Sequence, residues 1–160
     1  MLTFATICTV FCYLISAHLL SYRLLKRRYI CSQRWELNIC SGDTDGGGIN
    51  ADIIFRKSVP RFVLVDVYRL PFRDKQFSDI LCSHTMEHVE DPERFYEELM
   101  RVGKSVSMII PPLWDVWAMF DFFEHKWIFL TFRKVHTTLP RRVRLPLTQI
   151  IHGRFGQKIR

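Results

Sequence analysis

The sequence predicts an α/β protein in which a mostly parallel, minimal or truncated β-sheet follows an N-terminal transmembrane or apolar helix. Short apolar runs stop abruptly at polar residues, most clearly at Asp66 and at Ser83-His84. Parallel strands that end in this way bring their polar residues to one edge of a sheet, where α/β folds bind ligands. A capped helix start at Asp91 follows the second run, and residues 2–20 contain no Asp, Glu, Lys or Arg.

Length and charge narrow the class of protein. A chain of 160 residues, 48% of them hydrophobic, suits one domain and excludes a disordered chain. The net charge is +7, and no acidic residue follows Glu124. This basic C-terminal segment fits an anionic partner, such as a lipid surface, a nucleic acid or a phosphorylated substrate, or simply a solvated surface. No RNA-binding motif accompanies the charge, so a nucleic-acid binder is the least favoured class.

The five cysteines predict neither a zinc site nor a redox motif. None forms a CxxC pair, and no His/Cys cluster has zinc spacing, so we expect no metal. We expect the thiols to be reduced and buried, as in a reducing compartment. The cysteines are Cys8, Cys12, Cys31, Cys40 and Cys82.

Residues 1–22 are predicted to form a membrane-anchor helix. The uncharged run at 2–20 is nineteen residues long, and as a helix it covers about 30 Å, the thickness of bilayer hydrocarbon. Basic residues follow it at once, none precedes it, and no clear cleavage site follows, so a cleaved signal peptide fits poorly. The positive flank predicts a single-pass membrane protein with a cytoplasmic C-terminal domain. The alternative is a buried or interfacial helix, which polar residues such as Thr6 and His18 keep open.

Residues 23–35 are predicted to be a basic linker and residues 36–160 an α/β domain with a basic, aromatic C-terminal segment. Five strands are expected in this domain, because five short apolar runs are bounded by turn residues. The strands are Glu36–Cys40, Ile49–Phe55, Phe62–Val67, Ser78–Cys82 and Val106–Ile110.

The most secure helix begins at Asp91-Pro92, since Asp is a good capping residue and Pro suits the first helical position. Apolar residues at helical spacing continue it to Gly103. A second helical spacing runs from Leu113 to Phe123. Beyond it, Trp127–Phe132 fits a strand or a helix end, and Thr148–Ile151 fits a last strand.

Two carboxylates, Asp52 and Asp66, stand at strand ends. A carboxylate after the second strand of a nucleotide-binding sheet can accept two hydrogen bonds from a ribose diol. A carboxylate on the next strand can accept from an adenine amino group. The alternative is that each carboxylate only caps a turn.

Five stretches together resemble a known family. They are LNICSG, GGINADI, DVYRLPF, RDKQFSDILCSHTMEHVEDP and FYEELMRV. From Leu37 to Pro112 the chain thereby resembles the class I S-adenosylmethionine-dependent methyltransferases, of the short methyltransferase-domain type with a reduced first half. The resemblance implies a Rossmann-like fold, S-adenosylmethionine as cofactor, and methyl transfer by in-line displacement.

The resemblance also implies a cofactor site. Ser41 and Gly42 would lie under the methionine part of the cofactor, and Asp52 would hold the ribose. Asp66 and Val67 would flank the adenine. Ser83 and His84 would line the cleft where the methyl group leaves. The residues carried over are Ser41, Gly42, Asp52, Asp66, Val67, Ser83 and His84.

A general base is needed only if the attacking group must lose a proton. The candidates near the expected mouth of the cleft are His84, His88, Asp115 and His125. We favour a structural hydrogen bond for His88, since it stands near the start of the following helix.

The first half departs from the family pattern. The turn at 40–43 keeps one glycine of the usual GxGxG loop. About seven residues separate the first two strands, and the link from Phe55 to Phe62 is equally short, whereas a parallel crossover normally needs a dozen or more residues. Two crossover helices are therefore absent or reduced to loops. This leaves a minimal member, a different strand arrangement, or lost cofactor binding. The terminal antiparallel hairpin is also expected to be missing.

We therefore expect either methyl transfer to a small or lipid-linked acceptor, or a catalytically inactive binding or scaffold protein at a membrane. The aromatic segment at 114–132 would wall an apolar substrate, lie against the bilayer, or serve as ordinary core. Residues 2–20 would provide the membrane contact.

Overall fold

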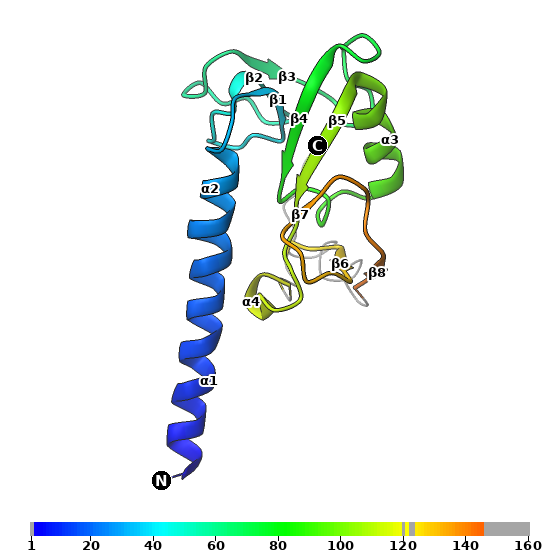
Figure 1. The fold of residues 1–160 in the computed structure, drawn as a ribbon. Coiled ribbons are helices and arrows are strands. Elements are labelled where there is room, and N and C mark those ends of the chain that lie inside the picture. The colour runs from blue at the N-terminus through cyan, green and yellow to red at the C-terminus, as the bar shows by residue number, and fades with distance from the viewer. Residues whose placement is uncertain (1, 120, 122–123, 146–160) are drawn as a thin grey trace.

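The structure, a computed structural model, describes residues 2–119, 121 and 124–145. Figure 1 shows a long helical rod, which starts at the N-terminus, beside an α/β unit. The rod consists of α1 (Leu2–Leu19), the π-helical segment η1 (Leu20–Lys26) and α2 (Arg27–Ile30). No Gly or Pro occurs in it, so no residue breaks the helix. The basic residues predicted to form a linker thus continue the helix, and residues 31–34 make the connection to the first strand.

The rod has a free end and a docked end. Near the N-terminus its apolar side chains are exposed, as at Phe4 with 73% of its surface accessible. Near the other end Ser21 and Ile30 are buried against the domain. Thr3–Ile30 is the one helical stretch among the described residues that is long and apolar enough to cross a membrane, by length and composition alone.

A six-stranded sheet in the order β3-β2-β1-β4-β5-β7 forms the frame of the domain. Its strands are β1 (Trp35–Ile39), β2 (Gly47–Asp52), β3 (Phe62–Leu64), β4 (Phe77–Ser83), β5 (Gly103–Ile109) and β7 (Val135–His136). The first five are parallel, which confirms the mostly parallel, Rossmann-like sheet. The short β7 is antiparallel to β5, so one antiparallel edge strand is present where none was expected.

The carboxyl ends of the central strands lie level at one edge of the sheet. Ile39 of β1 pairs with Ala51 of β2 and with Cys82 of β4. Polar residues that follow these three positions are therefore neighbours in space, as the sequence pattern predicts.

Two parallel connections contain no helix: residues 40–46 join β1 to β2, and residues 53–61 join β2 to β3. Seven extended residues reach roughly 23 Å, whereas the five residues of β1 cover about 17 Å, so a loop is long enough to return. Asn50 Oδ1 holds that loop by accepting from Gly46 N at 2.9 Å and from Asn38 Nδ2 at 3.1 Å. The sequence leaves three arrangements open for this half of the sheet. One of them, a minimal sheet with regular strand order, is compatible with links of this length.

Helix α3 (Pro92–Val102) covers one face of the sheet. Asp91 Oδ1 accepts from Arg94 N at 3.0 Å and Pro92 occupies the first turn, so the predicted start of the helix is confirmed. Gly103 follows the helix directly. A Cβ atom there would lie 2.5 Å from Cδ1 of Ile80, so a side chain at this position would force Ile80 to move.

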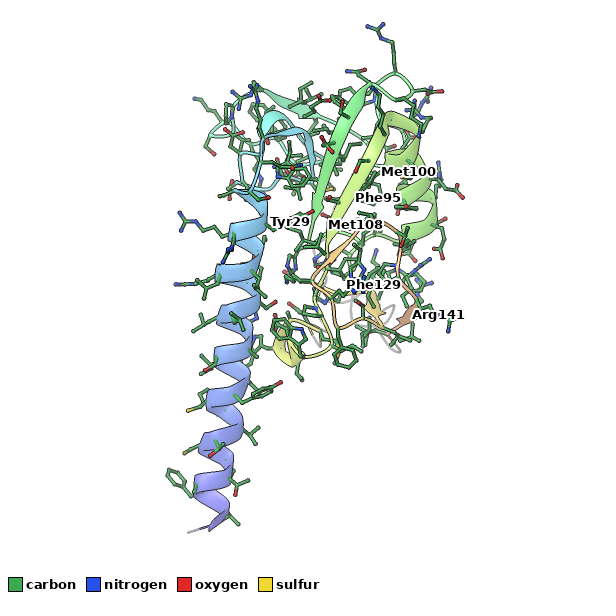
Figure 2. All side chains as sticks on the ribbon, in the orientation of Figure 1. Tyr29, Phe95, Met100, Met108, Phe129 and Arg141 are labelled. Carbon is green, nitrogen blue, oxygen red and sulfur yellow. The ribbon has the colours of Figure 1, made fainter. Side chains whose placement is uncertain are left out.

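Successive residues of β5 face opposite sides of the sheet, as strand geometry requires. Met108 packs toward α3 in the main core with Phe95 and Phe129 (Figure 2). Its neighbour Ile109 faces the other side, where it meets Ile30 at the end of the helical rod. The two faces are therefore covered by different parts of the chain, α3 on one side and the docked end of the rod on the other.

The C-terminal segment is less regular than expected. Only Val116–Met119 is helical among the described residues of 113–123, and it forms the single turn α4. Strand β6 (Trp127–Phe129) pairs antiparallel with β8 (Arg142–Arg144), which decides the predicted alternative in favour of a strand. The predicted strand Thr148–Ile151 lies outside the described residues.

The five cysteines are free, but the prediction that all are buried is wrong. Cys82 is buried in the core and Cys40 is half-buried. Cys8, Cys12 and Cys31 are exposed, since the first two lie on the free end of the rod and the third lies in the connection after it.

Candidate active site

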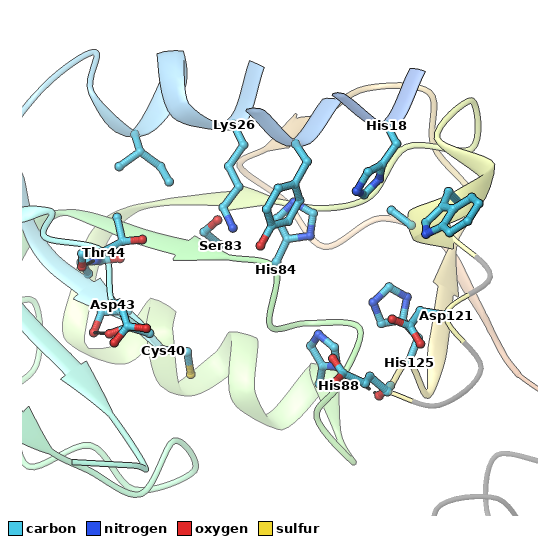
Figure 3. Close-up of a pocket in the computed structure, with 18 residues that line it drawn as sticks. His18, Lys26, Cys40, Asp43, Thr44, Ser83, His84, His88, Asp121 and His125 are labelled. Atoms are coloured by element: carbon cyan, nitrogen blue, oxygen red, sulfur yellow. Dashed lines mark hydrogen bonds between the residues drawn. The ribbon is translucent and has the colours of Figure 1, made fainter. Parts of the chain in front are cut away.

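A cavity of about 570 Å³ lies between the carboxyl ends of β1 and β4 and the docked half of the helical rod (Figure 3). Its volume is within the range of small-molecule sites, and its place is the edge at which α/β sheets bind ligands. Four parts of the chain line it. These are the β1–β2 turn with the strand residue before it (Asn38, Cys40 to Thr44), the end of β4 and the turn after it (Ser83, His84, His88), the rod (His18, Tyr22, Lys26, Ile30) and the segment around α4 (Trp117, Ala118, Asp121, Glu124, His125).

The turn after β1 places Ser41 and Gly42 at the cavity. Gly42 has φ +53°, a conformation that favours glycine, and a Cβ atom there would meet nothing within 4 Å. Its backbone N donates to Asp52 Oδ2 at 2.9 Å, and Ile54 N donates to the other oxygen at 3.2 Å. Asp52 thus fixes the turn from behind and does not line the cavity, so its predicted contact with a ribose stays a prediction.

Asp66 and Val67 follow β3, which lies one strand further from the cavity than β2. Asp66 is exposed and its Oδ1 accepts from Tyr68 N at 2.9 Å, in the manner of a turn cap. Val67 is buried in the main core. Neither residue lines the cavity. Of the predicted cofactor residues, the fold therefore gathers Ser41 and Gly42 with Ser83 and His84 at the end of β4. The other three lie behind the turn or further along the sheet.

His84 follows the last residue of β4 and has φ +53°, an uncommon conformation for a residue with a side chain. Its Nε2 lies 2.9 Å from Nζ of Lys134, and its Nδ1 lies 3.1 Å from Oε1 of Glu87. An ammonium group only donates, so Nε2 accepts and Nδ1 carries the proton that faces Glu87. Burial lowers the pKa of His84 to about 4, so the ring is neutral near pH 7.

The rod supplies a whole wall of the cavity. His18 Nδ1 lies 3.2 Å from Asp115 Oδ1, Ser21 Oγ accepts from Lys134 Nζ at 2.9 Å, and Lys26 Nζ lies 4.2 Å above the ring of Tyr22. Sequence reasoning placed no site residue here. The signal was available, because His18, Ser21, Tyr22 and Lys26 are polar residues at helical spacing along one face of an otherwise apolar helix.

Asp115, a predicted candidate for the general base, is fully buried and does not line the cavity. Its Oδ1 accepts from Ala118 N at 3.2 Å and faces His18, so it caps α4 and positions that histidine.

Two further candidates, His88 and His125, lie together at the other end of the cavity, their ring centroids 4.8 Å apart. Glu87 lies beside them, so the fold gathers three metal-ligating side chains within 4.8 Å where the sequence spacing predicts none. Burial by itself would raise the pKa of Glu87, but the surrounding histidines, His84 first, lower it to about 2. Burial also lowers the pKa of His125.

The chain is similar to known proteins over the strands that border the cavity. The family described as "Methyltransferase domain" matches residues 37–110. No curated protein matches the chain. Solved structures with a similar fold include the PH0226 protein of Pyrococcus horikoshii OT3, with 19% identity over 81% of this chain and 74% of that chain and a TM-score of 0.48.

Two others are an S-adenosylmethionine-dependent methyltransferase of Thermotoga maritima (20% identity, 68% of this chain and 60% of that chain, TM-score 0.47) and the YcgJ protein of Bacillus subtilis (21%, 48% and 43%, TM-score 0.40). The chain thus spans about half the length of these last two proteins.

The matched residues run from β1 to the residue after β5 and include the end of β4 at the cavity. The order β3-β2-β1-β4-β5 is that of a nucleotide-binding, doubly wound sheet. S-adenosylmethionine is the cofactor of the family. Over residues 37–110 the chain is similar to the methyltransferase-domain family, which agrees with the resemblance to the class I S-adenosylmethionine-dependent methyltransferases that the sequence motifs carry.

Proposed function

We propose that the chain transfers the methyl group of S-adenosylmethionine to a small or lipid-linked acceptor at a membrane surface. The observation that carries this proposal is the cavity between the family-matched strand ends and a helix whose exposed apolar part continues away from the domain. The site and the candidate anchor therefore share one helix.

The cavity residues fit such a cofactor. Ser83 Oγ is buried at the cavity with no hydrogen-bond partner among the described residues, and such a group requires one. Gly42 leaves open space beside it. In the proposed role, Ser41 and Gly42 hold the methionine part, while Lys26 supplies a positive charge for its carboxylate.

S-adenosylmethionine supplies the electrophilic methyl group of its sulfonium. The protein contributes position and exclusion of water, which are the main sources of rate in an in-line displacement. His84 is neutral, but its Nε2 already accepts from Lys134, so we assign it a positioning role at the mouth of the cleft.

The rod also suggests how the domain meets a membrane. Tyr13 OH lies 3.4 Å from Trp114 O, so the domain reaches along the rod as far as residue 13. The eleven residues at 2–12 cover about 16 Å, half of the hydrocarbon thickness. If the domain around α4 (Val116–Met119) lies at the membrane surface, this free segment inserts about half-way into the hydrocarbon layer and does not span it. Trp117 and Phe132 are exposed on the C-terminal segment at 58% and 73%, as interfacial aromatic residues would be.

The second candidate is a catalytically inactive binding or scaffold protein at a membrane. The observation in its favour is that both oxygens of Asp52, the predicted ribose ligand, are engaged by backbone N–H groups. The reduced glycine loop points the same way.

Titration calorimetry of the intact protein in detergent micelles, with S-adenosylmethionine and S-adenosylhomocysteine, separates the two candidates. We expect both compounds to bind. Gly42→Asn tolerates the left-handed backbone but puts a side chain into the open space, so it should weaken binding at least tenfold. Lys57→Asn, at an exposed position in the next loop, is the matched control. Absence of binding by the folded wild-type chain would leave only the inactive protein.

The acceptor is tested with cofactor that carries a labelled methyl group. Label recovered in the lipid fraction of a membrane extract supports a lipid-linked acceptor, and label in the aqueous fraction supports a small one. Flotation with phospholipid vesicles tests the anchor. A chain that stays at the bottom of the gradient contradicts the membrane part of the proposal and leaves the cofactor part standing.

A further inference from the structure

Glu87 is a buried carboxylate with few polar neighbours. It is 1% exposed, and neither of its carboxylate oxygens has a hydrogen-bond partner of good geometry among the described residues. Its one close polar contact is His84 Nδ1 at 3.1 Å. A buried carboxylate with so few polar neighbours is costly, and native proteins pair such groups with cations or metal ions.

The backbone holds Glu87 rigidly beside two histidines. Its carbonyl oxygen accepts from Lys126 N at 2.7 Å and from Trp127 N at 3.2 Å, which ties the turn after β4 to the segment before β6. This tie brings His125 next to Glu87, while His88 comes from the same turn as Glu87. One ligand atom from each of these three side chains lies within 4.8 Å of the others.

Each histidine has one ring nitrogen held by the backbone. Nδ1 of His88 lies 3.0 Å from Glu124 O, and a carbonyl accepts, so this nitrogen carries the proton and Nε2 keeps a free lone pair. The ring of His125 hydrogen-bonds the backbone of Met119. Metal-binding histidines in proteins are oriented in this way, by donation of the second ring N–H to a carbonyl or carboxylate.

We propose that Glu87, His88 and His125 bind one zinc ion. Two imidazoles and a carboxylate form a three-ligand set of the kind that holds Zn²⁺ with an open coordination position. His88 and His125 line the cavity (Figure 3), so the open position of a bound zinc would face it. Ligand atoms around a tetrahedral zinc lie about 3.4 Å apart. The ligand atoms of the three side chains therefore move about 1 Å closer to one another when the ion binds.

The test uses the full chain in detergent micelles, stripped with a chelator and titrated with ZnCl₂ against a chromophoric chelator. The background is Cys8→Ser with Cys12→Ser, because two exposed thiols one helical turn apart bind zinc themselves. We expect one zinc per chain. His88→Ala and His125→Ala should each weaken binding at least a hundredfold, and Glu87→Gln at least tenfold. His136→Ala, outside the cluster, is the control.

Two results would overturn the site. One is a folded background chain that takes up no zinc at micromolar concentration. The other is equal affinity in His88→Ala and His136→Ala. If His125→Ala fails to fold by circular dichroism, the half-buried His88 decides, and loss of the visible absorption of bound Co²⁺ in His88→Ala gives a second readout. Zinc binding is measured without S-adenosylmethionine, so its failure and a failure of methyl transfer are separate results.

Discussion

The Nζ atom of Lys134 lies 2.9 Å from Nε2 of His84, and this contact joins the C-terminal segment to the end of β4 beside the cavity. The same ammonium donates to Ser21 Oγ on the helical rod at 2.9 Å. Lys134 is 8% exposed, and burial lowers its pKa from 10.5 to about 8. One buried lysine therefore links three distant segments. The free-energy cost of burying its charged ammonium group depends on pH.

Stability should rise between pH 8 and pH 10.5 because of Lys134. In this window the folded state has lost the proton while the unfolded state still binds it, so the free energy of unfolding increases with pH. The full shift corresponds to at most about 3 kcal/mol. Denaturant unfolding of wild type and Lys134→Met across this range measures the difference. Lys104→Met, at an exposed position, should follow wild type. Parallel curves for wild type and Lys134→Met would contradict the assignment.

Asn50→Ala should destabilise the fold by about 3 kcal/mol, because it leaves several buried groups without partners. Asn50 is fully buried, and its Nδ2 donates to Asp45 Oδ1 and to Pro60 O, each at 2.9 Å. Its Oδ1 holds Gly46 N in the return loop. Equilibrium unfolding in urea measures the loss. Gln33→Ala removes an exposed amide and should change stability by less than about 0.5 kcal/mol, so equal effects of the two variants would refute this role for Asn50.

The same asparagine explains why the first half of the sheet was hard to predict. Local signals identified the helix start at Asp91 and the strand ends at β1 and β4, because capping and the alternation of apolar residues are properties of neighbouring residues. The loop at 40–46 is instead held by contacts between Asn38 and Asn50 on adjacent strands. No local pattern indicates such a pair, so from the sequence alone a short parallel link conflicts with the usual length of a crossover.

The site can be predicted only in part from the sequence, because contacts between distant segments complete it. Ser83 and His84 follow an apolar run, and the sequence places them at the cavity, where the structure also has them. Lys26 and His18 belong to the rod and reach the cavity only because the rod docks on the sheet. The charge that begins at Arg23 indicates the end of an apolar span, but not the end of the helix, which continues to Ile30.

Gly48→Ala should be far more harmful than Gly42→Ala. A Cβ atom on Gly48 would lie 2.3 Å from Trp35 O and 2.4 Å from Glu36 O, so β2 could not pair with β1 at this position. We expect loss of at least about 3 kcal/mol or failure to fold. A Cβ atom on Gly42 meets nothing within 4 Å, and only its φ of +53° opposes alanine, at about 1 kcal/mol. Urea unfolding ranks the two, and similar losses would show that β1 and β2 are not packed so closely.

The two predicted cofactor carboxylates should behave differently when removed. Asp52→Ala deprives Gly42 N and Ile54 N of their acceptor, loosens the turn at the cavity, and should weaken binding of S-adenosylhomocysteine about tenfold. Asp52→Asn retains one acceptor oxygen and should fall between this variant and wild type. Asp66→Ala should stay within about twofold, because Asp66 is exposed and caps a turn away from the cavity.

Titration calorimetry of the intact chain, with folding checked by circular dichroism, gives these affinities. An Asp66→Ala effect as large as that of Asp52→Ala would show that the adenine reaches β3, as the family resemblance implies, and that the cofactor extends beyond the cavity. An Asp52→Asn effect equal to that of Asp52→Ala would mean that the charge itself contacts the cofactor. The gradation expected here arises only if Asp52 acts through the backbone of Gly42, because a neutral carbonyl oxygen can replace one oxygen of a turn acceptor but not a charge.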